Sequence, residues 1–152
     1  MALAHCYDST RRHFDLGVEG GQFVHDDTLR GPVRISVHTD RRVEASELED
    51  GETNQRGWWG DRFRDDDEPI GSRLWLLNTA KPTVQNAEKG RIYMVECLIW
   101  MVRRGLAERI EAEAEIIPLE AGADAIRVTG MIYQPGDVAP RFSEVWEQTR
   151  AA

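Results

Sequence analysis

Acidic side chains are the residues of this sequence whose types and spacing could do chemistry. Asp61, Asp65 and Glu68 lie within one short stretch, and two neighbouring carboxylates are what a glycoside hydrolase uses. One carboxyl of such a pair needs an apolar pocket that raises its pKa. The segment 65–68 is instead a run of four acids, which we expect to ionise near their ordinary pKa values. The run therefore favours a solvated turn, and it lacks the alternating ligands and central glycine of a calcium loop.

Histidines offer two further candidate sites. His38 lies two residues before Asp40, as a general base held by a carboxylate would, but a lone histidine at the end of a segment is more often solvated or packed. Near the N-terminus four potential metal ligands occur together: His5, Cys6, Asp8 and His13. Their spacing fits no common zinc pattern, and the chain has no nucleophile elbow, P-loop or dinucleotide fingerprint. We therefore expect no catalytic residue, cofactor or metal, and a protein that is not an enzyme.

Composition bounds the size and the partners of the protein. Its 152 residues, 41% of them hydrophobic, suffice for one domain over 1–152 with a single core, of which 1–12 is a polar, flexible N-terminal segment. A net charge of −8 argues against nucleic acid and anionic membranes as partners. No apolar run approaches the roughly 18 residues of a membrane span, and no signal peptide is evident. Cys6 and Cys97 are far apart, which favours free thiols.

The segment Gly57 to Leu77 must position any site, because it holds three of the five tryptophans. Trp58, Trp59 and Trp75 each combine a large apolar ring with one N–H donor, which is typical of a core edge or an interface. Gly57, Gly60 and Gly71 occur where the backbone turns tightly or approaches another part of the chain.

Periodicity predicts the elements on either side of this segment. The string around Glu19-Gly20-Gly21 predicts a short hairpin. For 29–38 the capping side chains Asp26, Asp27 and Thr28 predict a helix, whereas Val33, Ile35 and Val37 alternate as a strand would. Apolar residues at steps of three and four predict the main helix over Thr83 to Arg104, with Thr83 as its N-cap and Gly105 as the residue that ends it. Its expected apolar stripe is Val84, Ala87, Arg91, Val95, Leu98 and Val102, widened by Ile92, Ile99 and Trp100.

The C-terminal third alternates strictly with a period of two. Arg109 to Ile117 and Ala125 to Tyr133 predict two antiparallel strands, and the small residues Ala112, Ala114 and Gly130 leave room for the helix to lie close. Phe142, Val145 and Trp146 lie three and four residues apart, which indicates a last short amphipathic segment. We therefore expect an α+β fold, in which a small antiparallel or mixed sheet packs on one long helix beside an irregular Trp/Gly/Arg-rich segment.

Three strings also carry a family resemblance: Arg41-Arg42, Arg56 to Asp61 and Ile70 to Leu77. In this order they resemble the small baseplate wedge family of Mu-like phages, which is related to the sheath-initiator or baseplate assembly protein W group of contractile tails. The resemblance covers roughly Phe14 to Glu147. It implies a helix for 29–38, with Pro32 in the first turn, and a structural protein of the virion tail baseplate that is assembled in the host cytoplasm.

The resemblance also implies partners and contact residues. The expected partners are other baseplate wedge subunits and the tail sheath protein, with tail tube or hub proteins as further candidates and six copies per baseplate. A strand edge of the hairpin from Arg109 to Tyr133 would start the sheath by strand augmentation. The candidate interface residues are Trp58, Trp59, Arg73, Trp75, Phe142 and Trp146, and the candidate structural arginines are Arg41 and Arg42.

A carboxylate-dependent glycoside hydrolase is the alternative function, because distant relatives have carried a lysozyme-like label. Turnover of cell-wall sugar that depends on Glu68 would distinguish this alternative from a structural role.

Overall fold

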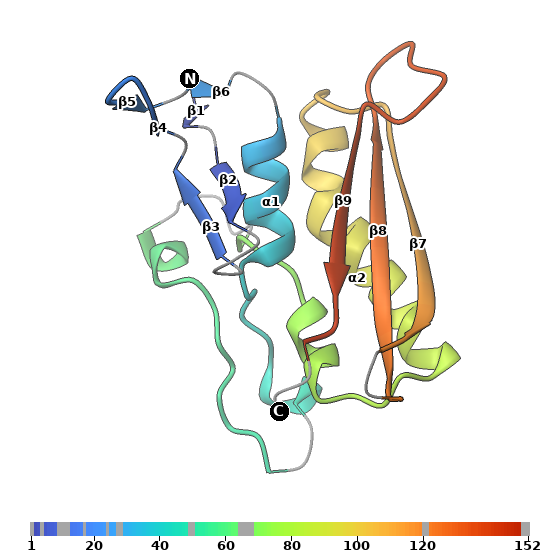
Figure 1. The fold of residues 1–152 in the computed structure, drawn as a ribbon. Coiled ribbons are helices and arrows are strands. Elements are labelled where there is room, and N and C mark those ends of the chain that lie inside the picture. The colour runs from blue at the N-terminus through green and yellow to red at the C-terminus, as the bar shows by residue number, and fades with distance from the viewer. Residues whose placement is uncertain are drawn as a thin grey trace. The chain divides into compact units, whose positions relative to one another are not determined.

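The computed structural model describes residues 2–3, 5–8, 13–16, 18–23, 25–26, 29–48, 51–63, 69–119 and 122–149 (Figure 1). The chain divides into two compact units, Met1–Arg34 and Ile35–Ala152, and each is described by itself. The helices and the three-stranded antiparallel sheet confirm the predicted α+β class. The single domain over 1–152 and the flexible segment 1–12 stay predictions.

The first unit contains short antiparallel strands: β1 (Ala2–Leu3), β2 (His5–Asp8), β3 (His13–Leu16), β4 (Val18–Glu19), β5 (Gln22–Phe23) and β6 (His25–Asp26). β1 pairs with β6, β2 with β3 and β4 with β5. The predicted hairpin is confirmed, since Gly20 and Gly21 between β4 and β5 have φ angles of 59° and 79°, as a tight hairpin turn requires. No strand was predicted at β1 and β2. These segments are short and polar, so their sequence has no alternation of apolar residues that would indicate a strand.

Helix α1 (Arg30–His38) confirms the helix for 29–38, and the alternative strand is wrong. Pro32 lies in the first turn, where its missing N–H breaks no helical hydrogen bond. Val33, Ser36 and Val37 are buried, so the buried positions follow helical spacing, while Ile35 is exposed. The capping candidates Asp27 and Thr28 lie outside the described residues.

Helix α2 (Val84–Arg103) confirms the predicted main helix. Thr83 Oγ1 accepts the backbone N–H of Asn86 at 3.2 Å, and Gly105 has a φ of +70° just beyond the end. The predicted apolar stripe is partly wrong, because Val84 and Ile92 are exposed. The buried positions are Ala87, Gly90, Met94, Cys97, Leu98 and Met101.

Close approach to the sheet decides which face of α2 is buried. A Cβ on Gly90 would lie 2.8 Å from Val128 Cγ2, and one on Gly130 would lie 2.9 Å from Met94 Sδ. The glycines therefore let helix and strand backbones approach each other. This confirms the prediction that Gly130 leaves room for the helix.

The sheet of the second unit has the order β7 (Arg109–Pro118), β8 (Asp124–Tyr133) and β9 (Phe142–Glu147). The predicted hairpin of β7 and β8 is confirmed, with Ala112 opposite Gly130, and α2 packs on one face of the sheet (Figure 1). The segment 142–146, whose spacing suggested an amphipathic element of helical period, is instead a strand paired with β8. Strand alternation puts Phe142 and Trp146 on one face and Val145 on the other.

A buried glutamine joins the sheet to the segment before α2. Gln148 Nε2 donates to the carbonyl oxygens of Leu77 at 2.6 Å and Ala80 at 2.7 Å, and its Oε1 accepts the N–H of Ile126 at 3.1 Å. The side chain thus satisfies three backbone groups of two distant segments.

Between α1 and α2 the chain forms three 3-10 turns, η1 (Ala45–Glu47), η2 (Trp59–Phe63) and η3 (Leu74–Asn78). Leu74, Trp75 and Leu77 of η3 are buried in the core. η2, in contrast, is largely exposed. The tryptophan segment is therefore anchored at its C-terminal end and open at its N-terminal end.

Candidate subunit interface

The three strings that carry the family resemblance lie side by side in the second unit. Arg41 N donates to Ser72 O at 3.0 Å, and Ser72 N donates to Thr39 O at 2.9 Å. Gly71, the residue before Ser72, has a φ of +104°, and a Cβ there would lie 2.3 Å from Thr39 O. The crossing of these two segments therefore requires glycine at position 71.

A second glycine, Gly57, lets the second string (Arg56 to Asp61) approach the first (Arg41-Arg42). Gly57 has a φ of +104°, and a Cβ there would lie 2.7 Å from Arg42 Cβ. Next to it Val43 N donates to Gln55 O at 3.2 Å. The short stretch 41–43 is thus bonded to 72 on one side and to 55 on the other.

The buried side chain of Trp75 holds the segments 39–43 and 71–75 together. Only 5% of the residue is exposed, and its Nε1 donates to Arg41 O at 2.9 Å. The Arg56 guanidinium lies 4.4 Å from the centre of a Trp75 ring and donates to Asp40 Oδ2 at 2.7 Å. Trp75 can therefore serve an interface only by holding the segment in place, because its ring is covered within the unit.

Arg73 links three elements by charge-assisted hydrogen bonds. Its Nη2 donates to Glu96 Oε2 of α2 at 2.6 Å, its Nη1 pairs with Glu47 of η1, and its guanidinium lies 4.6 Å from the Tyr93 ring centre. Burial alone would lower the pKa of Arg73, but the bonds to Glu96 and Glu47 raise it. The N–H of Glu44, and to a smaller extent Arg73, lower the pKa of Glu47.

The two candidate structural arginines differ in what they contribute. Arg41 supplies its backbone N–H and carbonyl to the crossing, as described above. The Arg42 guanidinium donates to the neutral amide oxygen of Gln55 at 2.5 Å. The other two candidate residues lie on β9, where Trp146 is buried and Phe142 is half-buried.

The exposed aromatic cluster consists of Trp58, Trp59 and Phe63. Their exposed fractions are 38%, 76% and 76%. The rings of Trp58 and Trp59 have centroids 5.6 Å apart, and those of Trp59 and Phe63 have centroids 6.1 Å apart. The Trp58 ring covers Gly60, where a Cβ would lie 2.2 Å from Cη2. Sequence reasoning missed Phe63, although its position four residues after Trp59 was a usable signal.

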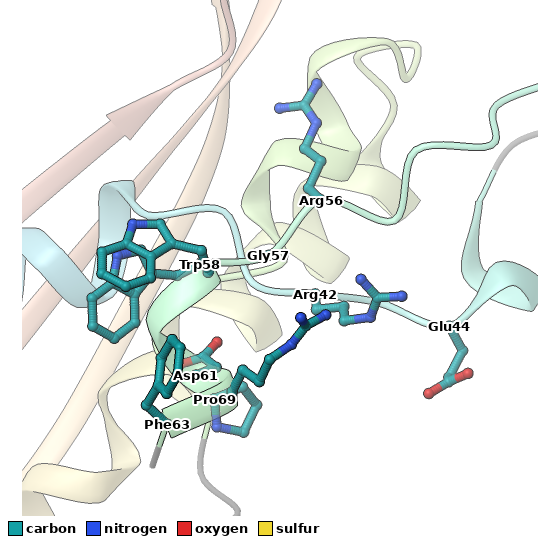
Figure 2. A pocket seen from close by; sticks show the side chains of 10 residues that line it. Arg42, Glu44, Arg56, Gly57, Trp58, Asp61, Phe63 and Pro69 are labelled. Atoms are coloured by element: carbon teal, nitrogen blue, oxygen red, sulfur yellow. The ribbon is translucent and has the colours of Figure 1, made fainter.

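An open groove of about 810 Å³ lies along this cluster (Figure 2). Its lining residues are Arg42, Glu44, Arg56, Gly57, Trp58, Trp59, Asp61, Arg62, Phe63 and Pro69. In Figure 2 the rings of Trp58 and Phe63 lie towards one end, Arg42 and Glu44 lie towards the other, and the side chain of Arg56 points away. The groove therefore combines apolar rings with arginines.

The candidate chemical residues have structural partners where they are described. Asp61 Oδ1 accepts the N–H of Ile70 at 3.0 Å, while the acidic run 65–68 lies outside the described residues. His38 is not held by Asp40: its Nε2 lies 3.0 Å from Glu144 Oε1, and Asp40 binds Arg56. Burial raises the pKa of the Cys97 thiol to about 12, which makes it unreactive.

The described part of the chain has neither a metal-binding cluster nor a membrane-spanning helix. Its His, Cys, Asp and Glu residues form no group of three or more that could hold a metal ion. None of its helices is both long and apolar enough to cross a membrane.

Comparison with known proteins identifies the family. The model of the family described as phage protein GP46 matches residues 29–138. Baseplate protein gp46 of Escherichia phage Mu is 43% identical over 102 residues, which are 66% of this chain and 69% of that protein. The Mu-like prophage FluMu protein gp46 of Haemophilus influenzae is 35% identical over 99 residues, 65% of this chain and 64% of that protein. The matched region includes α1, the tryptophan segment, α2 and the β7-β8 hairpin, and on this match the chain belongs to the GP46 family of phage proteins.

Proposed function

We propose that this chain is a structural component of a phage tail baseplate wedge, where it binds other wedge subunits and initiates assembly of the tail sheath. The observation that carries the proposal is the 43% identity to the Mu protein named as a baseplate protein. Tail tube or hub proteins are further candidate partners, and we expect six copies in each baseplate.

The exposed aromatic cluster supports a subunit contact at the tryptophan segment. Exposed aromatic rings beside arginines are the residue types that carry most interface energy. Trp59 and Phe63 are each 76% exposed, although their backbone is held by the Asp61 bond to Ile70. A rigid backbone that presents exposed rings loses little conformational entropy when a partner binds.

The outer edge of β7 supports strand augmentation. β8 is paired on both sides, so only β7 of the predicted hairpin is an edge strand. Leu119 N donates to Ala123 O, so these two residues form a hydrogen-bonded pair at the end of the hairpin. Hydrogen-bonded and non-hydrogen-bonded pairs alternate along antiparallel strands. The odd-numbered residues of β7 therefore bond to β8, and the N–H of Ala114 points away from β8. Pro118 occupies another outward position, where its missing N–H costs no bond within the sheet.

Ala114→Pro tests the edge, since it removes one outward N–H and leaves the β7-β8 ladder intact. We expect the purified variant to unfold like the wild type but to recruit less sheath protein to baseplates. Ala114→Val is the matched control, because it keeps the N–H. Equal sheath recruitment by the two variants would refute augmentation at this edge.

Trp59→Ala and Arg73→Ala test the interface. We expect both proteins to stay soluble but to be incorporated poorly into baseplates, as measured by the protein content of purified particles. Val138→Ala is a suitable control, because this apolar residue is exposed outside the aromatic cluster. Normal particles from the Trp59 and Arg73 variants would show that the subunit contact lies elsewhere.

A further inference from the structure

We propose that the groove along the exposed aromatic cluster binds an acidic segment of a partner protein that also carries an apolar side chain. The inference rests on the proposed baseplate function, and it adds the chemistry of the partner segment.

The charges of the groove favour carboxylates as ligands. Arg62 is exposed and forms no ion pair with any described residue, and the Arg42 guanidinium donates to the neutral amide oxygen of Gln55. Two acidic residues also line the groove. Asp61 directs Oδ1 to the backbone of Ile70, and its Oδ2 is buried; Glu44 is exposed at the end where Arg42 lies. Two guanidinium groups without a carboxylate partner among the described residues therefore face an incoming chain, and guanidinium groups bind carboxylates by paired hydrogen bonds.

The aromatic side of the groove favours an apolar side chain next to those carboxylates. Trp59 and Phe63 leave most of their surface to solvent and lie nearly edge to face, at an interplanar angle of 75°. An aliphatic or aromatic side chain placed against these rings would remove apolar surface of both partners from water.

A protein segment fits better than a nucleic acid, although arginines beside exposed rings also bind single strands. The whole chain carries a net charge of −8, which repels a phosphate backbone at long range. A short acidic segment brings few charges, and it can be held by Arg42 and Arg62 alone.

The test measures binding of fluorescent decapeptides to the purified full chain. The probe contains several glutamates around one phenylalanine, and its analogues replace glutamate by glutamine or phenylalanine by alanine. We expect the glutamine analogue to bind about tenfold more weakly, since charged hydrogen bonds are each worth about 1.5 kcal/mol or more. Arg42→Gln combined with Arg62→Gln should give a similar loss, whereas the exposed control Arg141→Gln should not.

Four results would overturn the inference. The glutamate and glutamine peptides could bind equally, or the glutamate probe could fail to bind at millimolar protein. A single-stranded oligonucleotide could bind more tightly than the glutamate probe. Finally, the probe could bind much more tightly when the acids at 65–68 are converted to their amides. The last result would assign the groove to the chain's own acidic run.

Incorporation into baseplates separates failure of this inference from failure of the proposed function. If Trp59→Ala blocks incorporation but the double arginine variant does not, the subunit contact stands and the acidic occupant is wrong. If all variants incorporate normally while the purified chain still binds the glutamate peptide, the groove binds acidic segments but the proposed contact in the baseplate is wrong.

Discussion

Gly71→Ala should be among the most damaging single-methyl changes in this protein. The new Cβ would lie 2.3 Å from Thr39 O, whereas an ordinary contact begins near 3.4 Å. The neighbouring atom belongs to the backbone, so the two crossing segments must separate by about 1 Å. This separation breaks the bonds Ser72 N to Thr39 O and Arg41 N to Ser72 O.

The loss of stability has two sources, the backbone conformation at position 71 and the broken hydrogen bonds. A positive φ, here +104°, costs alanine about 1 kcal/mol. The two broken hydrogen bonds cost about 1 kcal/mol each, and more where the groups stay buried. Ser72 is 2% exposed, so we expect a total loss of about 3 to 5 kcal/mol in the free energy of unfolding.

Gly136→Ala is the matched control for the clash. Gly136 also has a positive φ, +85°, but a Cβ there would meet nothing within 4 Å. Its loss should therefore be about 1 kcal/mol. Urea denaturation followed by tryptophan fluorescence measures both variants. Equal losses would refute the argument that the crossing at Thr39 requires glycine.

Four further outcomes are expected. The hydrogen bond from Glu44 and the pairing with Arg73 lower the pKa of Glu47 below its ordinary 4.5, so its contribution to stability is present above pH 4.5 and lost as the pH falls through the folded-state pKa; Glu47→Gln should flatten the acid limb of a stability-pH curve, and an unchanged limb would contradict this. Gln148→Leu should cost about 2 to 3 kcal/mol, because it removes the side-chain partner of the Ile126 N–H and of the Ala80 carbonyl, while the Leu77 carbonyl still accepts the N–H of Ala80; a loss below about 1 kcal/mol by urea denaturation would count against that role. Cys97 should react with a thiol reagent at pH 8 only after unfolding, since burial raises its pKa to about 12; rapid labelling of Cys97 in the folded chain, distinguished from Cys6 by peptide mapping, would disprove the burial. The purified chain should not hydrolyse cell-wall sugar, and turnover that Glu68→Gln abolishes would establish the alternative hydrolase.

Local patterns predicted the elements whose hydrogen bonds and periodicity lie within a short stretch of chain. The cap at Thr83 and the end at Gly105 bound α2 because both act within one turn. The strict alternation from Arg109 to Tyr133 predicted the β7-β8 hairpin, since one face of each strand is buried. The pattern from Val33 to Val37 satisfied both periods, and only the resemblance decided for a helix.

The candidate site was predicted in its position but not in its division of roles. Trp58, Trp59 and Trp75 are equivalent as sequence letters. The carbonyl of Arg41 accepts the Trp75 N–H, and that contact joins residues 34 positions apart. Trp75 is buried at this contact, whereas Trp59 is 76% exposed, and no local pattern contains this information.

The sequence by itself determined the α+β class, the main helix, the hairpin and the family, because periodicity, caps and ordered motifs are properties of neighbouring residues. Tertiary structure alone decided which face of α2 is buried, that 142–147 is a strand, and which tryptophans remain exposed. The physical reason is that each of these outcomes depends on a partner distant in the chain: Gly90 against Val128, β9 on the free side of β8, and Trp75 on the Arg41 carbonyl.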